Sequence, residues 1–287
     1  MTARPPVRTL GRDALSVGAT QLGTMALSFI VGIAITRLLG PEGRGELSLV
    51  WALATFIPFV GHTGIAASIP TLAASGYPLS RLVRTGYGLA LVSVGAIGVA
   101  LALGGPALAD AWHMRASLLY WGWAIGLAMT VRAAPMCGLL VEGRMRARNR
   151  FEGWPTLGYV ALILAGIAAD RIAVPYIIAV GLIANGVVGL VATAITFRWR
   201  WRAPREDPAL ADVDARTVRR EMWTFGWPSQ AGLAAGYLNN RLDLWLCGVW
   251  LVKSQTGFYS VATTVAELLA YLPNAIQDCA NQDHPQK

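Results

Sequence analysis

Long apolar segments separated by short polar stretches run through the whole chain, and none of them alternates apolar and polar residues with the period of two that membrane β-strands require. A helix needs about 20 apolar residues to cross a bilayer core about 30 Å thick. The fifth such segment, Trp154–Ala169, is short, which indicates either that its helix is tilted little or that the helix starts further upstream. The pattern predicts an all-α polytopic membrane protein with about eight transmembrane helices. The predicted spans are Ala14–Ile35, Leu47–Ile69, Leu82–Gly104, Ser117–Leu140, Trp154–Ala169, Ile172–Phe197, Phe225–Trp250 and Gly257–Ile276.

The composition strengthens this reading of the pattern. Apolar residues make up 55% of the chain and charged residues only 14%, whereas soluble domains carry about 25% charge. Such a chain has too few polar side chains to cover its own surface, which excludes a disordered protein, a disulfide-stapled secreted module and an ordinary cytosolic enzyme. The cysteines Cys137, Cys247 and Cys279 form no C-x-x-C pair, which favours structural thiols over metal or redox chemistry.

Basic residues test the orientation of the predicted spans, because Lys and Arg accumulate in cytoplasmic loops. With the N-terminus in the cytoplasm, the outer segments contain Arg37, Arg44, Arg115, Arg171 and Lys253, and two further arginines lie within spans. The cytoplasmic segments contain seventeen of the 24 basic residues: Arg4, Arg8, Arg12, Arg81, Arg84, Arg144, Arg146, Arg148, Arg150, Arg198, Arg200, Arg202, Arg205, Arg216, Arg219, Arg220 and Lys287. The first span is too long for a signal peptide, so we expect a retained helix. The bias predicts a multi-pass protein with a cytoplasmic N-terminus.

Arginine and tryptophan alternate from Arg198 to Arg202, directly after the sixth predicted span. This pattern suits a nucleic-acid or membrane-surface patch, but the same residue types anchor helix ends at a membrane boundary, which is the interpretation we favour. We therefore expect no nucleic-acid partner. The polar stretch that follows predicts three parts: a six-helix lobe over 1–197, a cytoplasmic linker over 198–222, and the first two helices of a second lobe over 223–287.

An internal repeat supports this division. A shift of 212 residues aligns Leu39 with Leu251, Gly45 with Gly257, Ser48 with Ser260 and Ala54 with Ala266. In both places a helix leaves the membrane, turns through a short loop and re-enters. The seventh predicted helix would therefore restart what the first began. The second copy would be incomplete, because only two of its helices are present.

Four motifs resemble the polysaccharide flippase family of the multidrug/oligosaccharidyl-lipid/polysaccharide exporter superfamily. They are the loop Ile35–Gly45, the helix end Gly61–Ser68, the run Asn240-Arg241-Leu242-Asp243, and Gly257–Ala262 followed by Glu267. The resemblance covers roughly Asp13 to Gln277. It implies two six-helix lobes around a central cavity, with this chain as a C-terminally truncated member.

The resemblance also implies a function. Such proteins move a polyprenyl-diphosphate-linked oligosaccharide from the inner to the outer leaflet of the bacterial cytoplasmic (inner) membrane, for lipopolysaccharide, capsule or exopolysaccharide assembly. The implied partners are the lipid-linked oligosaccharide, membrane lipids, and glycosyltransferases or a polymerase of the same pathway. Rival functions are a cation-coupled multidrug exporter of the same superfamily and an accessory membrane subunit that transports nothing.

No catalytic, metal-binding or phosphate-loop motif is present in the sequence, so we expect neither an enzyme nor a cofactor. Ionisable residues within spans are costly, which makes them candidates for function. Arg132, Arg241 and Asn240 are the candidates for binding a diphosphate in a cavity, because a guanidinium matches phosphate oxygens. Asp243 and Glu267 are the candidates for ion coupling.

Each candidate also has a structural interpretation. Arg132 suits an arginine held by helix carbonyls or one that reaches the interface, and a hydrogen-bonded carboxylate is the ordinary role for Glu267. Arg241 and Asp243 lie two positions apart, so they point to different helix faces and suit an interhelical clamp. Gln230 is expected to be polar glue between helices, and Pro58 to kink the second span.

Overall fold

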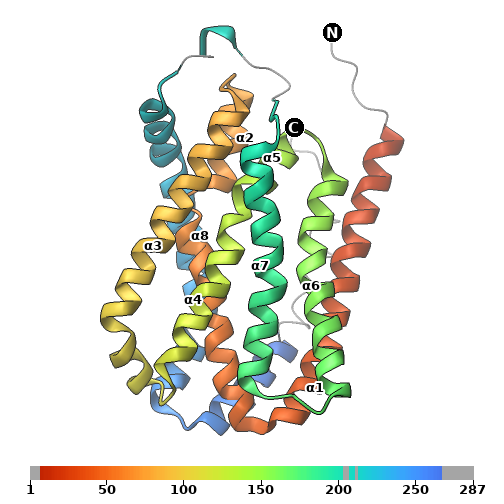
Figure 1. The fold of residues 1–287 in the computed structure, drawn as a ribbon, viewed down its shortest axis with the longest axis vertical. Coiled ribbons are helices and arrows are strands. Elements are labelled where there is room, and N and C mark those ends of the chain that lie inside the picture. The colour runs from red at the N-terminus through yellow and green to blue at the C-terminus, as the bar shows by residue number, and fades with distance from the viewer. Residues whose placement is uncertain (1–6, 203–206, 211–212, 267–287) are drawn as a thin grey trace, which may run out of the picture.

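The computed structural model describes residues 7–202, 207–210 and 213–266 of the chain. These form long helices that run up and down a single bundle (Figure 1). A further helix begins at residue 253 and is described as far as 266; we refer to it as helix 253–266. No β-strand occurs among the described residues. The labelled elements are α1 (Val7–Gly61), α2 (Ile65–Ala74), α3 (Leu79–Ala111), α4 (Ala116–Val131), α5 (Ala133–Val141), α6 (Met145–Ala168), α7 (Val174–Arg198), the 3-10 helix η1 (Pro208–Leu210) and α8 (Ala215–Trp250).

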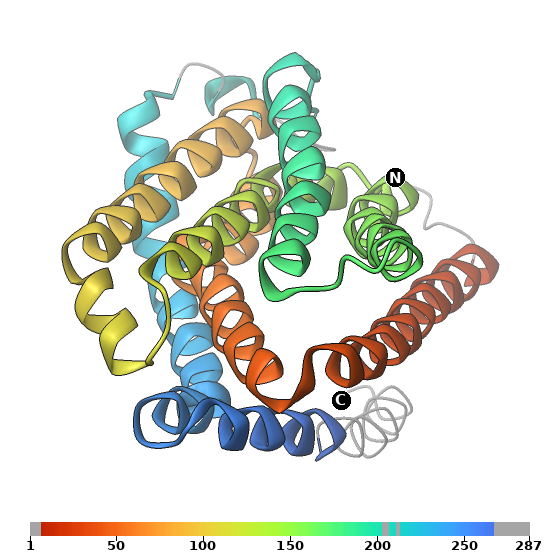
Figure 2. The ribbon, with the colours of Figure 1, turned by 60° about the horizontal axis from the view of Figure 1, so that its bottom comes forward.

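A sharp turn at Gly40 divides α1 into a first arm (7–39) and a second arm (41–61). Gly40 has φ 68° and ψ 179°, a conformation that glycine adopts without steric cost. Pro41 then fixes the φ of the first residue of the second arm. Figure 2 shows the red first arm and the orange second arm diverging from this turn. The turn lies within the predicted loop Ile35–Gly45.

Among the described residues, five helical stretches are long and apolar enough to cross a membrane, and the first of them contains the Gly40 turn. The predicted all-α polytopic membrane fold is therefore confirmed. The fifth predicted span begins nine residues upstream of Trp154, at Met145 of α6. Part of the predicted linker 198–222 is helical, because α8 already starts at Ala215. The side chains that hold this early turn, Val218 and Met222, are buried among α2 and α3.

Apolar side chains divide between an interior and a bilayer-facing surface. Ile57, Leu119 and Ile125 are fully buried, whereas Leu103 and Leu190 are 82% and 74% exposed. Exposed leucines of this kind are costly in water and favourable in lipid.

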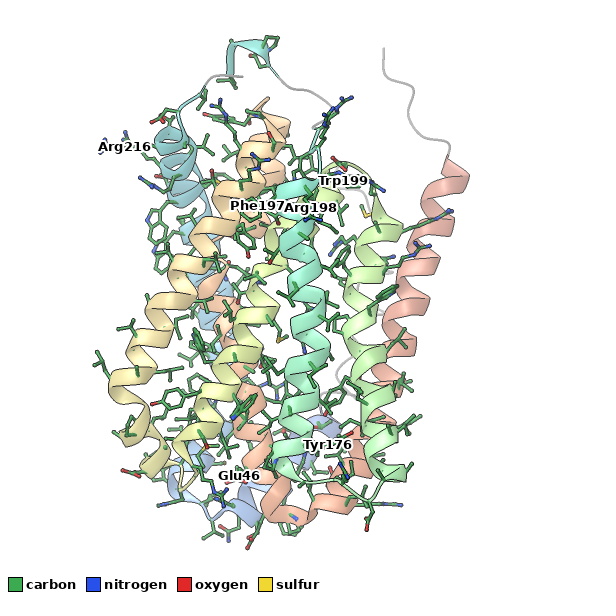
Figure 3. All side chains as sticks on the ribbon, in the orientation of Figure 1. Glu46, Tyr176, Phe197, Arg198, Trp199 and Arg216 are labelled. Carbon is green, nitrogen blue, oxygen red and sulfur yellow. The ribbon has the colours of Figure 1, made fainter. Side chains whose placement is uncertain are left out.

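The two ends of the bundle differ in chemistry. Figure 3 places Arg198, Trp199 and Arg216 at one end, and Glu46 and Tyr176 at the other. We call these the arginine-rich end and the opposite end. Which end faces the cytoplasm stays a prediction, based on the positive-inside bias.

The alternating Arg-Trp motif anchors the end of α7 inside the protein. Trp201 is buried at 4% exposure, and its Nε1 donates to the Thr196 carbonyl at 3.3 Å. Trp199 donates to Glu142 at 3.2 Å, and the Arg144 guanidinium lies 4.3 Å above its ring. Both indoles are therefore held by neighbouring segments of the protein, and anchoring at a membrane boundary stays a prediction.

The repeat of 212 residues reappears as a symmetric contact between the second arm of α1 and helix 253–266. A Cβ on Gly45 would lie 2.1 Å from the Lys253 carbonyl oxygen, and a Cβ on Gly257 would lie 1.9 Å from that of Pro41. Lys253 and Pro41 are themselves 212 positions apart, so each copy presents the same glycine to the same carbonyl of the other. We call this contact the glycine crossing.

Hydrogen bonds repeat the same symmetry. The Ser48 hydroxyl donates to the Gly45 carbonyl and the Ser260 hydroxyl to the Gly257 carbonyl, both at 2.8 Å. Two of the four identities, Gly45 with Gly257 and Ser48 with Ser260, therefore correspond to one local structure built twice.

Candidate functional site

Two adjoining compartments lie beside the glycine crossing, and we call them together the central cavity. The larger compartment measures about 570 Å³ and lies between both arms of α1, α6 and helix 253–266. The smaller measures about 230 Å³ and lies between the second arm, α8 and helix 253–266. Arg44, Trp51 and Thr264 line both compartments, which therefore adjoin.

Arg44 is the charged residue common to both compartments. It is half-buried, and its Nε is buried without a hydrogen-bond partner among the described residues. A buried donor without a partner is costly, so this geometry favours an anionic or hydrogen-bond-accepting ligand.

Sequence reasoning missed Arg44, because it was assigned to an outer loop. The Gly40 turn is so tight that the second arm already begins at residue 41, which makes Arg44 helical. Arg44, Ser48, Trp51 and Thr55 recur at helical spacing, and all four line the smaller compartment. This periodicity is the signal that could have identified the face.

Arg241 lines the smaller compartment from α8, opposite the second arm. Tyr237 holds the two helices together one turn away: its hydroxyl donates to the Ala52 carbonyl at 2.8 Å and lies 2.5 Å from the Thr55 hydroxyl. Of the predicted site residues that the structure describes, Arg241 is the one that lies on this cavity. Asn240 is exposed and does not line either compartment.

Asp243 points elsewhere, as its offset of two positions from Arg241 predicts. One carboxylate oxygen accepts a hydrogen bond from the Tyr259 hydroxyl, and the other accepts from the Leu244 N–H at 2.8 Å. The carboxylate therefore links α8 to helix 253–266, a contact with a partner helix. Its role in ion coupling stays a prediction, and Glu267 lies outside the described residues.

Arg132 lies at the break between α4 and α5. Pro135 has no N–H to bond the carbonyl of Val131, which explains the break. The Nη1 of Arg132 and the Nε2 of His62 are both buried without a partner among the described residues.

Arg132 and Arg241 line no common compartment of the central cavity. The structure thus separates two arginines that the sequence suggested as joint candidates. A role for Arg132 in binding a diphosphate stays a prediction.

A second close contact between α8 and the α1–α2 region lies towards the arginine-rich end. Gly64, with φ 78°, packs directly on the backbone of Gly226. The Gln230 side chain supplies hydrogen-bond partners to the backbone at the break between α1 and α2. Its oxygen accepts from the Gly64 N–H at 3.1 Å, and its amide NH2 donates to the Phe59 carbonyl. The central cavity therefore lies along the second arm between two close contacts, one at Gly45 and one at Gly64.

The walls of the cavity differ in character. The face between the first arm and helix 253–266 carries Phe29, Ile33, Val261 and Val265. The face shared by the second arm and α8 carries hydroxyl groups and arginines. Among the described lining residues, three are arginines and none is Asp or Glu. The cavity is therefore amphipathic, with positive charge at its polar side.

Comparison with known proteins identifies the family. The model of the family described as "Polysaccharide biosynthesis protein" matches residues 10–277, almost the entire chain. No curated protein and no solved structure matches the chain. The resemblance found in the motifs is confirmed: this multi-pass helical membrane protein belongs to the polysaccharide biosynthesis protein family.

Proposed function

We propose that this protein moves a lipid-linked oligosaccharide, joined to a polyprenyl carrier through a diphosphate, across the bacterial cytoplasmic membrane. The observation that carries the proposal is the pairing of Arg44 and Arg241 on one cavity inside an apolar bundle. Membership of a polysaccharide biosynthesis family supports a glycan as the cargo.

The two faces of the cavity suit the two halves of such a substrate. Guanidinium groups form charge-assisted hydrogen bonds with phosphate oxygens, and two arginines on different helices can hold a diphosphate from two sides. The hydroxyls of Ser48, Thr55 and Ser260 offer hydrogen bonds to sugar hydroxyls. The apolar wall between the first arm and helix 253–266 gives the polyprenyl chain contact with protein on its way to lipid.

The mechanism that we propose is alternating access at the two close contacts that bound the cavity. If only the glycine crossing separates, the cavity opens towards the opposite end. If only the Gly64–Gly226 contact separates, it opens towards the arginine-rich end, which the charge bias assigns to the cytoplasm. Ligand binding then shifts the balance between two states by its difference in affinity for them.

The basic lining favours this cargo over the cations of a multidrug exporter. A cationic drug or coupling ion in a low-dielectric site requires a carboxylate, and the described lining provides arginines instead. The nearby carboxylate of Asp243 already accepts two hydrogen bonds.

Translocation breaks no covalent bond, so the proposal includes no enzymatic activity and no cofactor. Glycosyltransferases that supply the lipid-linked substrate and a polymerase that consumes it are the partners it implies.

The test is surface glycan in cells that lack their own copy of the gene and carry variants of this chain. We expect Arg44→Gln and Arg241→Gln each to reduce surface glycan by roughly tenfold or more, the effect of losing about 1.4 kcal/mol of binding. Arg132→Ala is predicted to reduce it as well, from the sequence alone. Arg171→Gln, an exposed arginine outside the cavity, is the matched control. Normal glycan in both cavity variants, with normal membrane insertion, would contradict the proposal.

A further inference from the structure

A second cavity of about 550 Å³ opens at the opposite end of the bundle, beyond the glycine crossing; we call it the end pocket. Five segments contribute to it: the second arm, the α3–α4 loop, the start of α4, the start of α7, and helix 253–266. Its polar and aromatic members are Glu46, His113, Arg115, Ser117, Trp121 and Lys253. The end pocket shares none of its lining residues with the central cavity.

The α3–α4 loop is held so that its polar side chains face the end pocket. Trp112 and Met114 are buried at 3% and 8% exposure, whereas the alternate residues His113 and Arg115 are exposed and line the pocket. Trp112 packs in the interior, with its ring 6.0 Å from that of Trp245. His113 has φ 50°, a left-handed conformation that costs energy outside glycine and persists only where the surroundings enforce it. The buried residues thus fix the loop and position the basic side chains.

The charges in the end pocket are mixed and mostly positive. Lys253 forms an ion pair with Glu46 at 3.3 Å, with both side chains partly accessible. The Arg115 guanidinium makes no hydrogen bond or ion pair within the described part of the chain, so its donors are available to a ligand. Trp121 is 44% exposed on the same wall and presents an aromatic surface to the pocket.

We infer that the end pocket binds an acidic sugar, a saccharide unit that carries a carboxylate. Arg115 and Lys253 hold the carboxylate, Glu46 accepts hydrogen bonds from the sugar hydroxyls, and Trp121 packs against the C–H face of the ring. A simple phosphate fits less well, because it has no sugar ring for Trp121 to contact. The inference rests on the proposed function in one respect: the sugar would belong to the glycan that is moved.

The position of the end pocket supports this ligand. Glu46 follows directly after Gly45, and Lys253 is the residue whose carbonyl Gly45 contacts. The pocket therefore adjoins the contact that closes the central cavity at this end. A glycan leaving the cavity here would meet the end pocket next.

The test is binding of a glucuronic-acid-containing disaccharide to the purified full chain in nanodiscs of phosphatidylcholine, measured by calorimetry. We expect saturable binding, at least tenfold tighter than that of the same disaccharide with glucose in place of glucuronic acid. Loss of a hydrogen bond to a charged group weakens binding by about tenfold or more. We therefore expect this loss for Arg115→Gln and a clear weakening for Trp121→Leu. Arg171→Gln and Trp154→Leu, both exposed and outside the pocket, should bind as the unchanged chain does.

Several results would overturn the inference. Equal binding of the neutral disaccharide would show that the carboxylate is not recognised. Competition by inorganic phosphate at the same concentration, with no effect of Trp121→Leu, would show a simple anion site. Loss of sugar binding in nanodiscs of anionic lipid would show a lipid headgroup site. Arg44→Gln should leave this binding intact, so a failure of translocation and a failure of the end pocket are distinguishable.

Discussion

At the scale of single residues, buried nitrogen atoms without a hydrogen-bond partner distinguish two of the described arginines from the others. Arg44 and Arg132 each carry a buried nitrogen without a partner among the described residues, and such donors are costly at membrane depth. Of these two arginines, only Arg44 lines the central cavity, which gives a ligand room to satisfy its nitrogen. The sequence indicated Arg132 and Arg241 because they interrupt apolar runs. It did not indicate Arg44, because that residue lies at the edge of a run.

Gln230 gives a prediction at the same scale. Gln230→Leu leaves the Gly64 N–H and the Phe59 carbonyl without their partner, and a buried unsatisfied group costs about 1–3 kcal/mol. We expect a lower free energy of unfolding by about that amount, measured by denaturant titration in detergent.

Asn185→Leu is the matched control for Gln230→Leu. Asn185 is also buried, but the hydrogen bond it donates goes to the Gly181 carbonyl of its own helix. Loss of that bond leaves no backbone group at a helix break without a hydrogen-bond partner, because α7 is continuous there. Equal destabilisation by the two substitutions would contradict the role assigned to Gln230.

At the scale of helices, apolar runs predicted the elements well, whereas the breaks within them depend on individual residues. The span Leu47–Ile69 is one apolar run, but the helix breaks at residues 62–64, where Thr63 and Gly64 have positive φ. The helix continues past Pro58, and the His62 N–H bonds the Pro58 carbonyl at 2.9 Å, so Pro58 does not end the helix and the kink expected there stays a prediction. The close packing of Gly226 and the side chain of Gln230 stabilise the actual break. These tertiary contacts are not visible in the local sequence.

The glycine crossing gives a prediction for helix packing. Gly45→Ala or Gly257→Ala would place a Cβ about 2 Å from a backbone carbonyl, so the two helices must separate. We expect a short thiol cross-linker between Glu46→Cys and Lys253→Cys to react efficiently in a background without native cysteines. It should react poorly after either glycine substitution.

Gly186→Ala serves as the control for the crossing, because a Cβ there meets nothing within 4 Å. Alanine also favours a helix over glycine by about 1 kcal/mol. Cross-linking that persists in Gly45→Ala would show that the contact tolerates a side chain and that the crossing is not close-packed.

At the scale of the whole molecule, composition and span pattern were sufficient for the fold class, and the motifs for the family. The central cavity could not be placed from sequence, because it forms where the second arm, α8 and helix 253–266 meet across about 200 positions. The repeat was the one long-range signal, and it indicated the glycine crossing that bounds the cavity. The orientation rests on charge alone and has its own test.

Orientation is tested by labelling single cysteines with a membrane-impermeant maleimide. Glu42 and Arg200 are both exposed. The predicted topology places Glu42 in an outer segment and Arg200 in a cytoplasmic segment. With the N-terminus in the cytoplasm, Glu42→Cys should react in spheroplasts with an intact cytoplasmic membrane, and Arg200→Cys only after that membrane is permeabilised. The reverse pattern would invert the assignment.

The most direct test of the central claim is translocation by the purified full chain in liposomes. A fluorescent polyprenyl-diphosphate oligosaccharide is placed in one leaflet, and its appearance in the other is followed by quenching from outside. We expect the protein to accelerate this exchange, and Arg44→Gln and Arg241→Gln to slow it by roughly tenfold or more. Exchange no faster than in protein-free liposomes would contradict translocation and favour an accessory role. Exchange that both substitutions leave unchanged would remove the central cavity as the path.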